Sequence, residues 1–487
     1  MKNNSSDLIS RSLRAVWHPC TQMKHHEQLP LIAVARGAGA WLYDRDGKRY
    51  LDAISSWWVN LFGHANSHIN GALKTRLDTL EHAMLAGCTH EPAVELAERL
   101  SSLTSHVLGH AFFASDGASA VEIALKMSFH FWRNSGRSRK REFVCVANSY
   151  HGETIGALGV TDVALFKDAY DPLIRTAHVV ASPDARQARA GEQAADVAAR
   201  ALADVKRLFV ERGEQIAALI VEPLVQCATG FAMHDPSYLA GLRALCDEYH
   251  VHWIADEIAV GCARTGTFFA CEQARVWPDF LCLSKGISGG YLPLSIVLTR
   301  DPIYAAFYDD DTTRGFLHSH SYTGNPLACR AGLATLELFD AHDVLARNRV
   351  RSDALGALLE PLREHPYVQH LRRCGTLFAF DVSLPAGPAR RFSRRFFECA
   401  LANELLLRPI GTTVYLMPPY ILNDDEQMLL ATRLRATLET VLAELGGHEY
   451  DARPPGRHRR RDTVSPAVVP TRGSSDVDQD PCHGTGF

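Results

Sequence analysis

The sequence predicts an α/β fold: a large domain with a mostly parallel central sheet, plus a smaller α+β domain built from both termini. First, short apolar runs alternate with stretches of helical periodicity from His110 onward, which is typical of βαβ units. Second, five apolar runs end in polar or charged side chains. These runs are His110–Ala114, Phe143–Ala147, Ala217–Val221, Val251–Ala255 and Phe280–Leu283. Ligands bind outside the carboxyl ends of strands in such a sheet, so the five tips are expected to line one crevice.

The N-terminal residues, 1–67, are interpreted as the first segment of the smaller domain. Two strands are predicted between Val34 and Asp52, joined by an Asp-Gly turn. A hairpin placed before the α/β alternation favours a separate unit. The pattern becomes helical at about His68, where the large cofactor-binding domain, residues 68–326, is expected to begin.

Residues 327–448 are predicted to complete the smaller domain. The pattern favours a long helical stretch over about 327–359, shorter strands near Phe378–Val382 and Val414–Met417, and a final helix at Gln427–Leu445.

The last segment, 449–487, lacks apolar periodicity and is rich in Ser, Thr, Gly and Asp, which predicts a disordered tail. Its basic cluster, Arg453–Arg461, could serve as an interaction patch, but a solvated tail is the favoured interpretation.

Composition excludes several classes of protein. The chain has 487 residues, and 51 basic against 55 acidic side chains give a net charge of −4, so no overall basic field indicates nucleic acid or membrane binding. No run approaches the ~18 apolar residues of a membrane span. The 12 cysteines include no Cys-x-x-Cys pair, so no metal site is expected, and a reducing cytoplasm is the simplest location.

Lys285 and Asp256 are candidate catalytic residues, each at the end of an apolar run. A catalytic lysine must be desolvated enough to act as a neutral amine, and an aspartate at the base of a crevice can keep a cofactor's ring nitrogen protonated. A surface lysine and a helix N-cap aspartate are the alternatives. Gly286 and the pair Gly289-Gly290 favour the catalytic interpretation, because glycines let a bulky ligand approach the backbone.

A phosphate-binding loop is predicted at Asp116–Ser119, between a strand and a helix over Ala120–Trp132. Backbone N–H groups at the start of a helix bind a phosphate, aided by the helix dipole. Tyr150 stands at another strand tip, where its ring could stack on a cofactor or simply be half-buried. A lysine, an aspartate, an aromatic ring and a glycine-containing loop are together the parts that pyridoxal phosphate chemistry requires.

Two adjacent tryptophans, Trp57 and Trp58, precede the first long helix. They are interpreted as walls of an apolar substrate cleft, with core packing as the alternative for one of them.

Several short segments occur in the order seen in class III pyridoxal-phosphate aminotransferases. They are Asp116–Ser119, Tyr150–Gly152, Glu222-Pro223, Asp256-Glu257, Arg264–Gly266, Ser284–Gly286 and Ser321–Pro326. The sequence resembles this family from about Val16 to Leu445. The resemblance implies fold type I, aminotransferase activity, pyridoxal 5'-phosphate as cofactor and a homodimer with shared active sites.

The resemblance also implies roles for residues at the matching positions. Lys285 would bind the cofactor covalently and carry the substrate proton. Asp256 would bind the pyridine nitrogen, and Tyr150 would stack on the ring. Gly117 and Ala118 would donate backbone N–H groups to the phosphate.

From the other subunit, Ser321 would reach the cofactor phosphate, and Gly324 of the same segment would lie near substrate. Ala118 stands where the family usually has serine, so the hydroxyl contact there would be lost or supplied by Ser119.

Four further segments resemble the branch of the family that forms 7,8-diaminononanoate for biotin synthesis. They are Trp17–Met23, Ser55–Trp58, Arg408-Pro409 and Tyr415–Tyr420. This implies 8-amino-7-oxononanoate as amino acceptor and S-adenosylmethionine as donor.

On that resemblance, Arg408 would pair with the acceptor's carboxylate. Trp57, Trp58 and Tyr415 would line the cleft together with Tyr150, and Arg264 would lie near the amino donor.

Other functions remain open. Cys20 replaces the tyrosine that follows Trp-His-Pro in the best-known members, which keeps lysine as an alternative donor. Another class III ω-amino acid transaminase and an intramolecular aminomutase share the motifs. A pyridoxal-phosphate-binding regulator would need a DNA-binding domain, for which no helix-turn-helix pattern is present. A nicotinamide dehydrogenase would need a Gly-x-Gly-x-x-Gly fingerprint, which we do not find.

Overall fold

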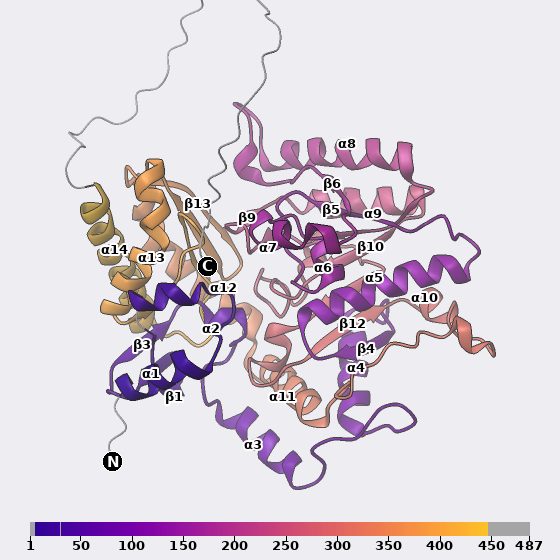
Figure 1. The fold of residues 1–487 in the computed structure, drawn as a ribbon, viewed down its shortest axis with the longest axis horizontal. Coiled ribbons are helices and arrows are strands. Elements are labelled where there is room, and N and C mark those ends of the chain that lie inside the picture. Colours follow the sequence, from indigo (N-terminus) through magenta and orange to yellow (C-terminus); the bar gives the residue numbers. More distant parts are fainter. Residues whose placement is uncertain (1–4, 30, 447–487) are drawn as a thin grey trace, which may run out of the picture.

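The computed structural model describes residues 5–29 and 31–446 (Figure 1). The segment predicted to be a disordered tail, 449–487, lies outside the described residues. Within the described ranges, no helix is long and apolar enough to cross a membrane. Nor does that part of the chain hold a cluster of three or more His, Cys, Asp or Glu side chains suited to a metal ion.

A seven-stranded sheet forms the centre of the larger part of the molecule, in the order β4-β12-β11-β10-β7-β5-β6. All strands run in one direction except β12, which is antiparallel to both of its neighbours. Their bounds are β4 (His110–Ala114), β5 (Glu142–Val146), β6 (His178–Val180), β7 (Ile216–Val221), β10 (His252–Asp256), β11 (Phe280–Leu283) and β12 (Ser295–Thr299). The predicted α/β fold with a mostly parallel sheet is confirmed.

Helices cover both faces of this sheet, because alternate side chains of each buried strand point to opposite sides. Ala218 and Ile220 of β7 pack in one cluster with α5 (Gly117–Asn134). Leu219 and Val221 pack in another, with α8 (Ala194–Arg212) and α9 (Ser237–Tyr249). Figure 1 shows α8 and α9 side by side along the edge of this part.

Strands from both ends of the chain share a second sheet. Its order is β1-β2-β3-β15, with β15 (Leu405–Leu406) running parallel to β3 (Arg49–Asp52). The other two strands are β1 (Val34–Ala38) and β2 (Trp41–Asp44). The predicted hairpin thus corresponds to β2 and β3 joined by the turn at Gly47, and β1 adds a third strand.

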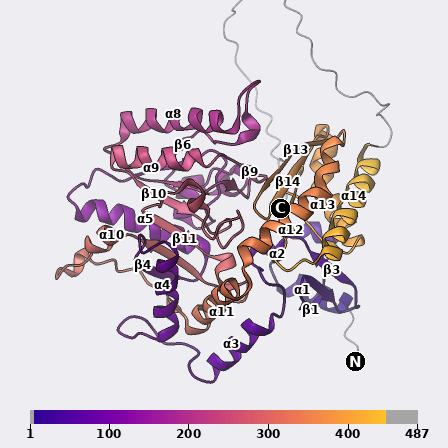
Figure 2. The ribbon, with the colours of Figure 1, turned by 180° about the vertical axis from the view of Figure 1, so that it is seen from behind.

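A third, antiparallel sheet joins β13 (Val368–Cys374), β14 (Leu377–Val382) and β16 (Thr413–Leu416). Figure 2 shows it gathered with α13 (Ala386–Ala402) and α14 (Asp424–Gly446) on the side opposite α8 and α9. A short hairpin, β8 (Val225–Gln226) and β9 (Ala232–Met233), follows β7.

The long helical stretch predicted over about 327–359 is present, with one break. It is two helices, α11 (Pro326–His342) and α12 (Val344–Leu359), because Asp343 has a left-handed conformation with φ 45° that ends the first. The other α-helices of the described residues are α1 (Ser5–Ala15), the short α2 (Ser55–Trp58), α3 (Ser67–Leu77), α4 (Glu91–Leu103), α6 (Ile155–Gly159), α7 (Ala164–Lys167) and α10 (Asp301–Ala305).

Candidate active site

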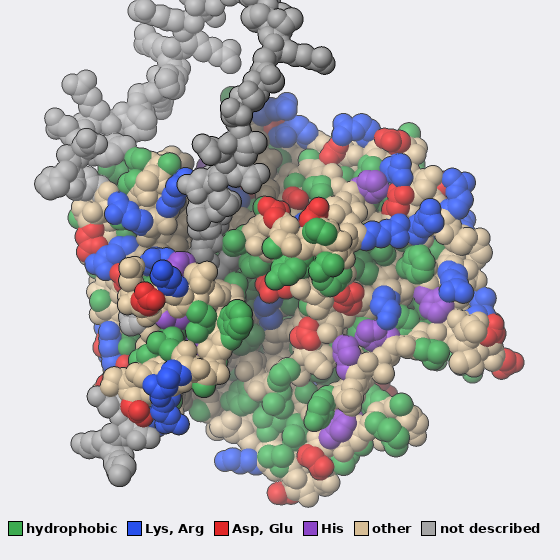
Figure 3. Space-filling model, in the orientation of Figure 1, with side chains coloured by type: hydrophobic (Ala, Val, Ile, Leu, Met, Phe, Trp, Pro, Cys, Tyr) green, Lys and Arg blue, Asp and Glu red, His purple; other side chains and the backbone are tan. Residues whose placement is uncertain are grey.

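A cavity of about 710 Å³ lies at the carboxyl ends of the central strands. All five predicted strand tips contribute to its lining: Asp116 and Gly117 after β4, Tyr150 and His151 after β5, Glu222 after β7, Asp256 at the end of β10, and Lys285 after β11. Figure 3 shows the surface hollowed between the two parts of the molecule.

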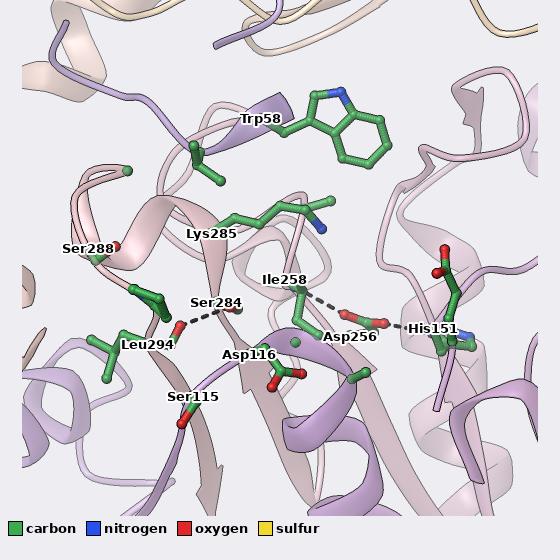
Figure 4. A pocket seen from close by; sticks show the side chains of 18 of the residues that line it. Trp58, Ser115, Asp116, His151, Asp256, Ile258, Ser284, Lys285, Ser288 and Leu294 are labelled. Carbon is green, nitrogen blue, oxygen red and sulfur yellow. Dashed lines mark hydrogen bonds and ion pairs between the residues drawn. The ribbon is translucent and has the colours of Figure 1, made fainter. Parts of the chain in front are cut away.

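The amine of Lys285 is enclosed in this cavity. A short 3-10 turn, Lys285–Ser288, follows β11 and starts with a positive φ of 45° at the lysine itself. Nζ lies 5.2 Å from the centre of the Trp58 ring, and Figure 4 shows the side chain pointing between Trp58 and Asp256. Burial lowers the pKa of Lys285, against the opposing charges of Asp256, Cys227 and Glu222, which favours the neutral amine.

Asp256 is held at both of its oxygens. Oδ2 lies 2.7 Å from Nδ1 of His151, and Oδ1 accepts the backbone N–H of Ile258 at 3.1 Å. The bond to Ile258 forms a local turn, but no helix starts at Asp256, so the N-cap alternative does not apply. Both His151 and Asp256 are buried, so the carboxylate has a fixed orientation at the base of the cavity.

Glu222 is a second buried carboxyl in the lining. It accepts the backbone N–H groups of Tyr150 at 3.1 Å and Cys227 at 3.0 Å. Burial raises its pKa to about 7, with Asp256 adding to the rise and His151 opposing it. Glu222 therefore anchors the loop that carries Tyr150.

The start of α5 faces the same cavity. Asp116 caps the helix by accepting the backbone N–H of Ser119 at 2.9 Å and its hydroxyl at 2.8 Å. Gly117 and Ala118 line the cavity beyond this cap. Gly152 lies so close that a Cβ there would sit 2.6 Å from that of Ala118. The loop after β5 therefore packs directly on the predicted phosphate loop.

The two tryptophans lie in different environments, although both belong to the short turn α2 (Ser55–Trp58). Trp58 is buried and lines the cavity, whereas Trp57 is 46% exposed and is not part of the lining. The interpretation as cleft walls therefore has a direct structural basis for Trp58 only.

Tyr415 and Arg408 lie beyond Trp58. The indole N–H of Trp58 donates to the Tyr415 oxygen at 3.2 Å, and the Tyr415 ring stacks on Phe231 at 4.4 Å. Burial lowers the pKa of Arg408, with Cys20 and Tyr415 acting against it, so these three side chains lie within electrostatic reach of one another. Cys20 is half-buried, and burial followed by the charge of Glu153 raises the pKa of its thiol.

Besides Trp57, Tyr415 and Arg408, three further residues with expected site roles lie outside the cavity lining in the single chain. Arg264 is fully buried, and its guanidinium donates to backbone carbonyl groups. Ser321 is exposed, and Gly324 packs against Leu85.

Of the glycine pair after Lys285, Gly290 lines the cavity, and both glycines also pack against the protein's own chain. A Cβ at Gly290 would lie 3.0 Å from backbone atoms of Val59 and Asn60, and one at Gly289 would lie 2.8 Å from Oγ1 of Thr335. They allow the protein's own chain to pack against the lysine turn.

Two buried residues that the sequence did not single out also shape the site. His151 belongs to the segment Tyr150–Gly152, and its position directly after a predicted strand could have indicated that it lies in the site. Asp52 accepts four hydrogen bonds around α2, and nothing in its local pattern indicates them.

The residues present fit pyridoxal 5'-phosphate. An enclosed amine faces an oriented carboxylate, a tyrosine lies at the edge, and a helix start with Gly117 and Ala118 is available for a phosphate. No other group of side chains in the lining suggests a different cofactor.

Comparisons with known proteins agree with this geometry. Residues 22–438 match the model of the family described as Aminotransferase class-III. A relative from Helicobacter pylori named adenosylmethionine-8-amino-7-oxononanoate aminotransferase is 45% identical over 431 residues, 87% of this chain and 96% of the relative. One of the same name from Nitratidesulfovibrio vulgaris is 38% identical, covering 88% of this chain and 82% of the relative.

Solved structures give the same result. The enzyme of that name from Methanocaldococcus jannaschii superposes with a TM-score of 0.84 at 32% identity, over 90% of this chain and 99% of that chain. An amine transaminase from an uncultivated Pseudomonas species, in its PLP-bound form, gives 0.83 at 30% identity, over 88% and 99%. The resemblance indicated by the motifs is thereby confirmed, and the chain belongs to the class III aminotransferases, enzymes that use pyridoxal 5'-phosphate.

Proposed function

We propose that this protein transfers an amino group from S-adenosylmethionine to 8-amino-7-oxononanoate, forming 7,8-diaminononanoate for biotin synthesis. The structural observation that carries the proposal is the series of contacts that leads from the Lys285 amine to the Trp58 ring, from Trp58 to Tyr415, and from Tyr415 to the charge of Arg408. It combines an apolar wall with one cation, which suits an acceptor that has a long apolar chain and a terminal carboxylate. The names of the relatives from H. pylori and M. jannaschii support the same reaction.

Lys285 is the proposed acid–base residue. The bound cofactor supplies a carbonyl carbon that binds amines and a ring that withdraws electrons from the substrate carbon. The Nζ of Lys285, whose pKa is lowered by burial, takes the proton from the α-carbon of the donor and later returns one to the acceptor. Both substrates use the same site in turn.

The other lining residues hold the cofactor in this proposal. Asp256, oriented by His151, keeps the proton on the ring nitrogen. Tyr150 packs against the ring, and Gly117 and Ala118 bind the phosphate through backbone N–H groups.

The substrate residues are proposed as a second group. Arg408 binds the acceptor carboxylate, because a guanidinium can make two parallel hydrogen bonds to it. Trp58 and Tyr150 line the cavity, and in this proposal Tyr415, bonded to Trp58, and the exposed Trp57 extend the substrate cleft beyond it.

We also propose a homodimer, in which Ser321 and Gly324 complete the partner's site. Two exposed apolar side chains stand near Ser321 in the sequence: Tyr322, the next residue (65% exposed), and Leu317, four residues before it (80% exposed). Two more exposed apolar side chains, Leu173 (68% exposed) and Tyr170 (50% exposed), belong to the 3-10 turn that follows α7. Apolar area of this kind is typical of a surface that another chain covers.

Lysine as amino donor is the second candidate. Cys20 and the carboxylate of Glu153 interact electrostatically, and a carboxylate there attracts the sulfonium of one donor and the ammonium of the other alike. The site's charge therefore does not separate the two donors.

A half-reaction on the purified holoenzyme tests the proposal. S-adenosylmethionine or lysine is added in separate cuvettes, and the visible absorbance of the bound cofactor is followed. Conversion by S-adenosylmethionine that 8-amino-7-oxononanoate reverses supports the proposal. Conversion by lysine alone would show that lysine is the amino donor. Reversal only by another carbonyl compound would show that the protein is a transaminase with a different acceptor.

A further inference from the structure

The turn that carries Trp58 has an unusual backbone. Ser55, Ser56, Trp57 and Trp58 have successive φ angles of 52°, 47°, 70° and 76°, all in the left-handed region. Residues other than glycine visit this region as single positions, because Cβ crowds the following carbonyl oxygen. Four in a row persist only where surrounding groups hold them in place.

Asp52 holds the turn from its N-terminal side. This fully buried carboxylate accepts the Ser56 backbone N–H at 2.9 Å and the Ser56 hydroxyl at 2.8 Å. It also accepts the Ile54 N–H at 3.4 Å and lies 3.0 Å from Nε2 of His64. Asn60 donates to Nδ1 of His64 at 3.0 Å, which leaves Nε2 as the donor to Asp52.

Arg264 holds the turn from its C-terminal side. Its guanidinium donates to the carbonyl oxygens of Trp58 at 3.3 Å, Asn60 at 3.1 Å and Pro418 at 2.8 Å. One planar cation therefore ties the end of the turn to the segment that follows β16. A lysine in its place could not bridge three carbonyl groups in this fork geometry.

The remaining contacts fix the turn against the catalytic parts of the site. The Ser55 hydroxyl donates to the Met417 carbonyl at 2.7 Å, two residues beyond Tyr415. On the other side, Gly290 of the lysine loop packs against the backbone of Val59 and Asn60. The turn thus links the loop of Lys285 to the strand of Tyr415, and the Trp58 ring lies between these two side chains.

We propose that Arg264 and Asp52 are positioning residues for substrate binding, which act by holding the left-handed turn so that the Trp58 ring stays above the Lys285 amine. Neither lines the cavity, so each acts through Trp58. The proposal rests on the proposed function in one respect, that Trp58 contacts the apolar chain of the substrate.

A double-mutant cycle separates this role from a general structural one. KM and kcat for 8-amino-7-oxononanoate, and the affinity for the cofactor, are measured for wild type, Arg264→Lys, Trp58→Phe and the double variant. We expect Arg264→Lys to raise KM about ten-fold and to change kcat and cofactor affinity less than about two-fold. In the Trp58→Phe background the same change should raise KM less than about two-fold further, because the ring that Arg264 positions is already altered.

Two more variants complete the test. Asp52→Asn should raise KM in the same way, which keeps the proposal testable if Arg264→Lys folds poorly. Arg243→Lys is the matched control. Arg243 lies on α9, is also buried, and pairs with Asp247 and Asp279. Its replacement should leave KM within about two-fold of wild type.

Additive effects of Arg264→Lys and Trp58→Phe would overturn the proposal. The proposal would also be overturned if Arg264→Lys and Arg243→Lys both lost kcat and cofactor affinity in proportion to their loss of thermal stability. If the wild type does not turn over 8-amino-7-oxononanoate, the proposed function fails instead. The cycle is then run with the amine and carbonyl pair that the wild type does accept, and the same non-additivity is expected.

Discussion

His151 and Asp256 form a buried pair at the base of the cavity, with Nδ1 and Oδ2 2.7 Å apart. The two side chains come from different strand tips, after β5 and at the end of β10. The second oxygen of Asp256 is fixed by the Ile258 backbone. The hydrogen bond to the imidazole therefore fixes the orientation in which the Asp256 carboxylate faces a ligand.

Replacing His151 should weaken cofactor binding. A hydrogen bond to a charged group contributes about 1.5–3 kcal/mol, so we expect His151→Phe to reduce the affinity for pyridoxal phosphate about 10–100-fold. Equilibrium titration of the apoenzyme, followed by absorbance, measures this. His252→Phe is the control, because His252 is buried at the opposite end of β10 and bonds to Ser128. An equal loss of cofactor affinity in both variants would show that burial, and not the bond to Asp256, is responsible.

The fold and the chemical parts of the site could be predicted because each depends on a local pattern. Buried strands such as Ala217–Val221 read as apolar runs, and Lys285 and Asp256 follow directly from where such runs end. Glu222 and Tyr150 could be predicted as strand-end residues for the same reason.

The contacts that join distant segments could not be predicted. Arg264 bonds to carbonyl groups of residues 58, 60 and 418, and no periodicity in the sequence relates these positions. The left-handed turn has no glycine to indicate it, and the break at Asp343 lies within a continuous helical pattern. Such features depend on tertiary contacts that override local propensity.

Removing the Lys285 amine should abolish covalent attachment of the cofactor. We expect Lys285→Ala to lower turnover about 10²–10⁴-fold, the usual effect of losing a general acid–base group. Borohydride reduction followed by peptide mass analysis should find the cofactor on the peptide containing Lys285 in wild type and on no peptide in the variant. Lys140→Met removes another buried lysine and should leave the labelling unchanged. Labelling of a different lysine in wild type would contradict the assignment.

Lys140 should make stability depend on pH in the alkaline range. Its buried amine donates to the carbonyl groups of Gly213 at 2.6 Å and Ile216 at 3.0 Å, and burial lowers its pKa from 10.5 to about 8. Between these two values the unfolded chain holds a proton that the folded protein has released, so the free energy of unfolding rises with pH there. Below about pH 8 both states are protonated and this gain is absent.

The change Lys140→Met removes that titration. Relative to the variant, wild type should gain up to about 3 kcal/mol between pH 8 and 10.5, measured as urea denaturation at several pH values. Lys74→Met, at an exposed position on α3, should follow wild type across the range. Parallel curves for wild type and Lys140→Met would rule the lowered pKa out.

Arg408 should decide how well the acceptor binds. Loss of a charge-assisted bond predicts that Arg408→Ala raises KM for 8-amino-7-oxononanoate about 10–100-fold, and Arg408→Lys less, because lysine keeps the charge but not the two parallel bonds. Steady-state kinetics with an analogue that lacks the carboxylate provides the control, since the substitution should then change KM little. An equal rise in KM for both acceptors would show that Arg408 does not bind the acceptor carboxylate.

The exposed side chain of Leu317 should be covered by a second chain in solution. It is 80% exposed and lies four residues before Ser321, the residue proposed to reach the partner's cofactor. A charge there would have to be buried without a partner, so Leu317→Asp should weaken dimerisation by at least about ten-fold and reduce cofactor affinity in parallel. Sedimentation at several protein concentrations measures the first effect and absorbance titration the second. Val210→Asp, at a residue 67% exposed on α8 away from the cavity, is the matched control and should change neither. If the wild-type protein sedimented as an active monomer, the proposed contact of Ser321 with the partner's cofactor would be wrong.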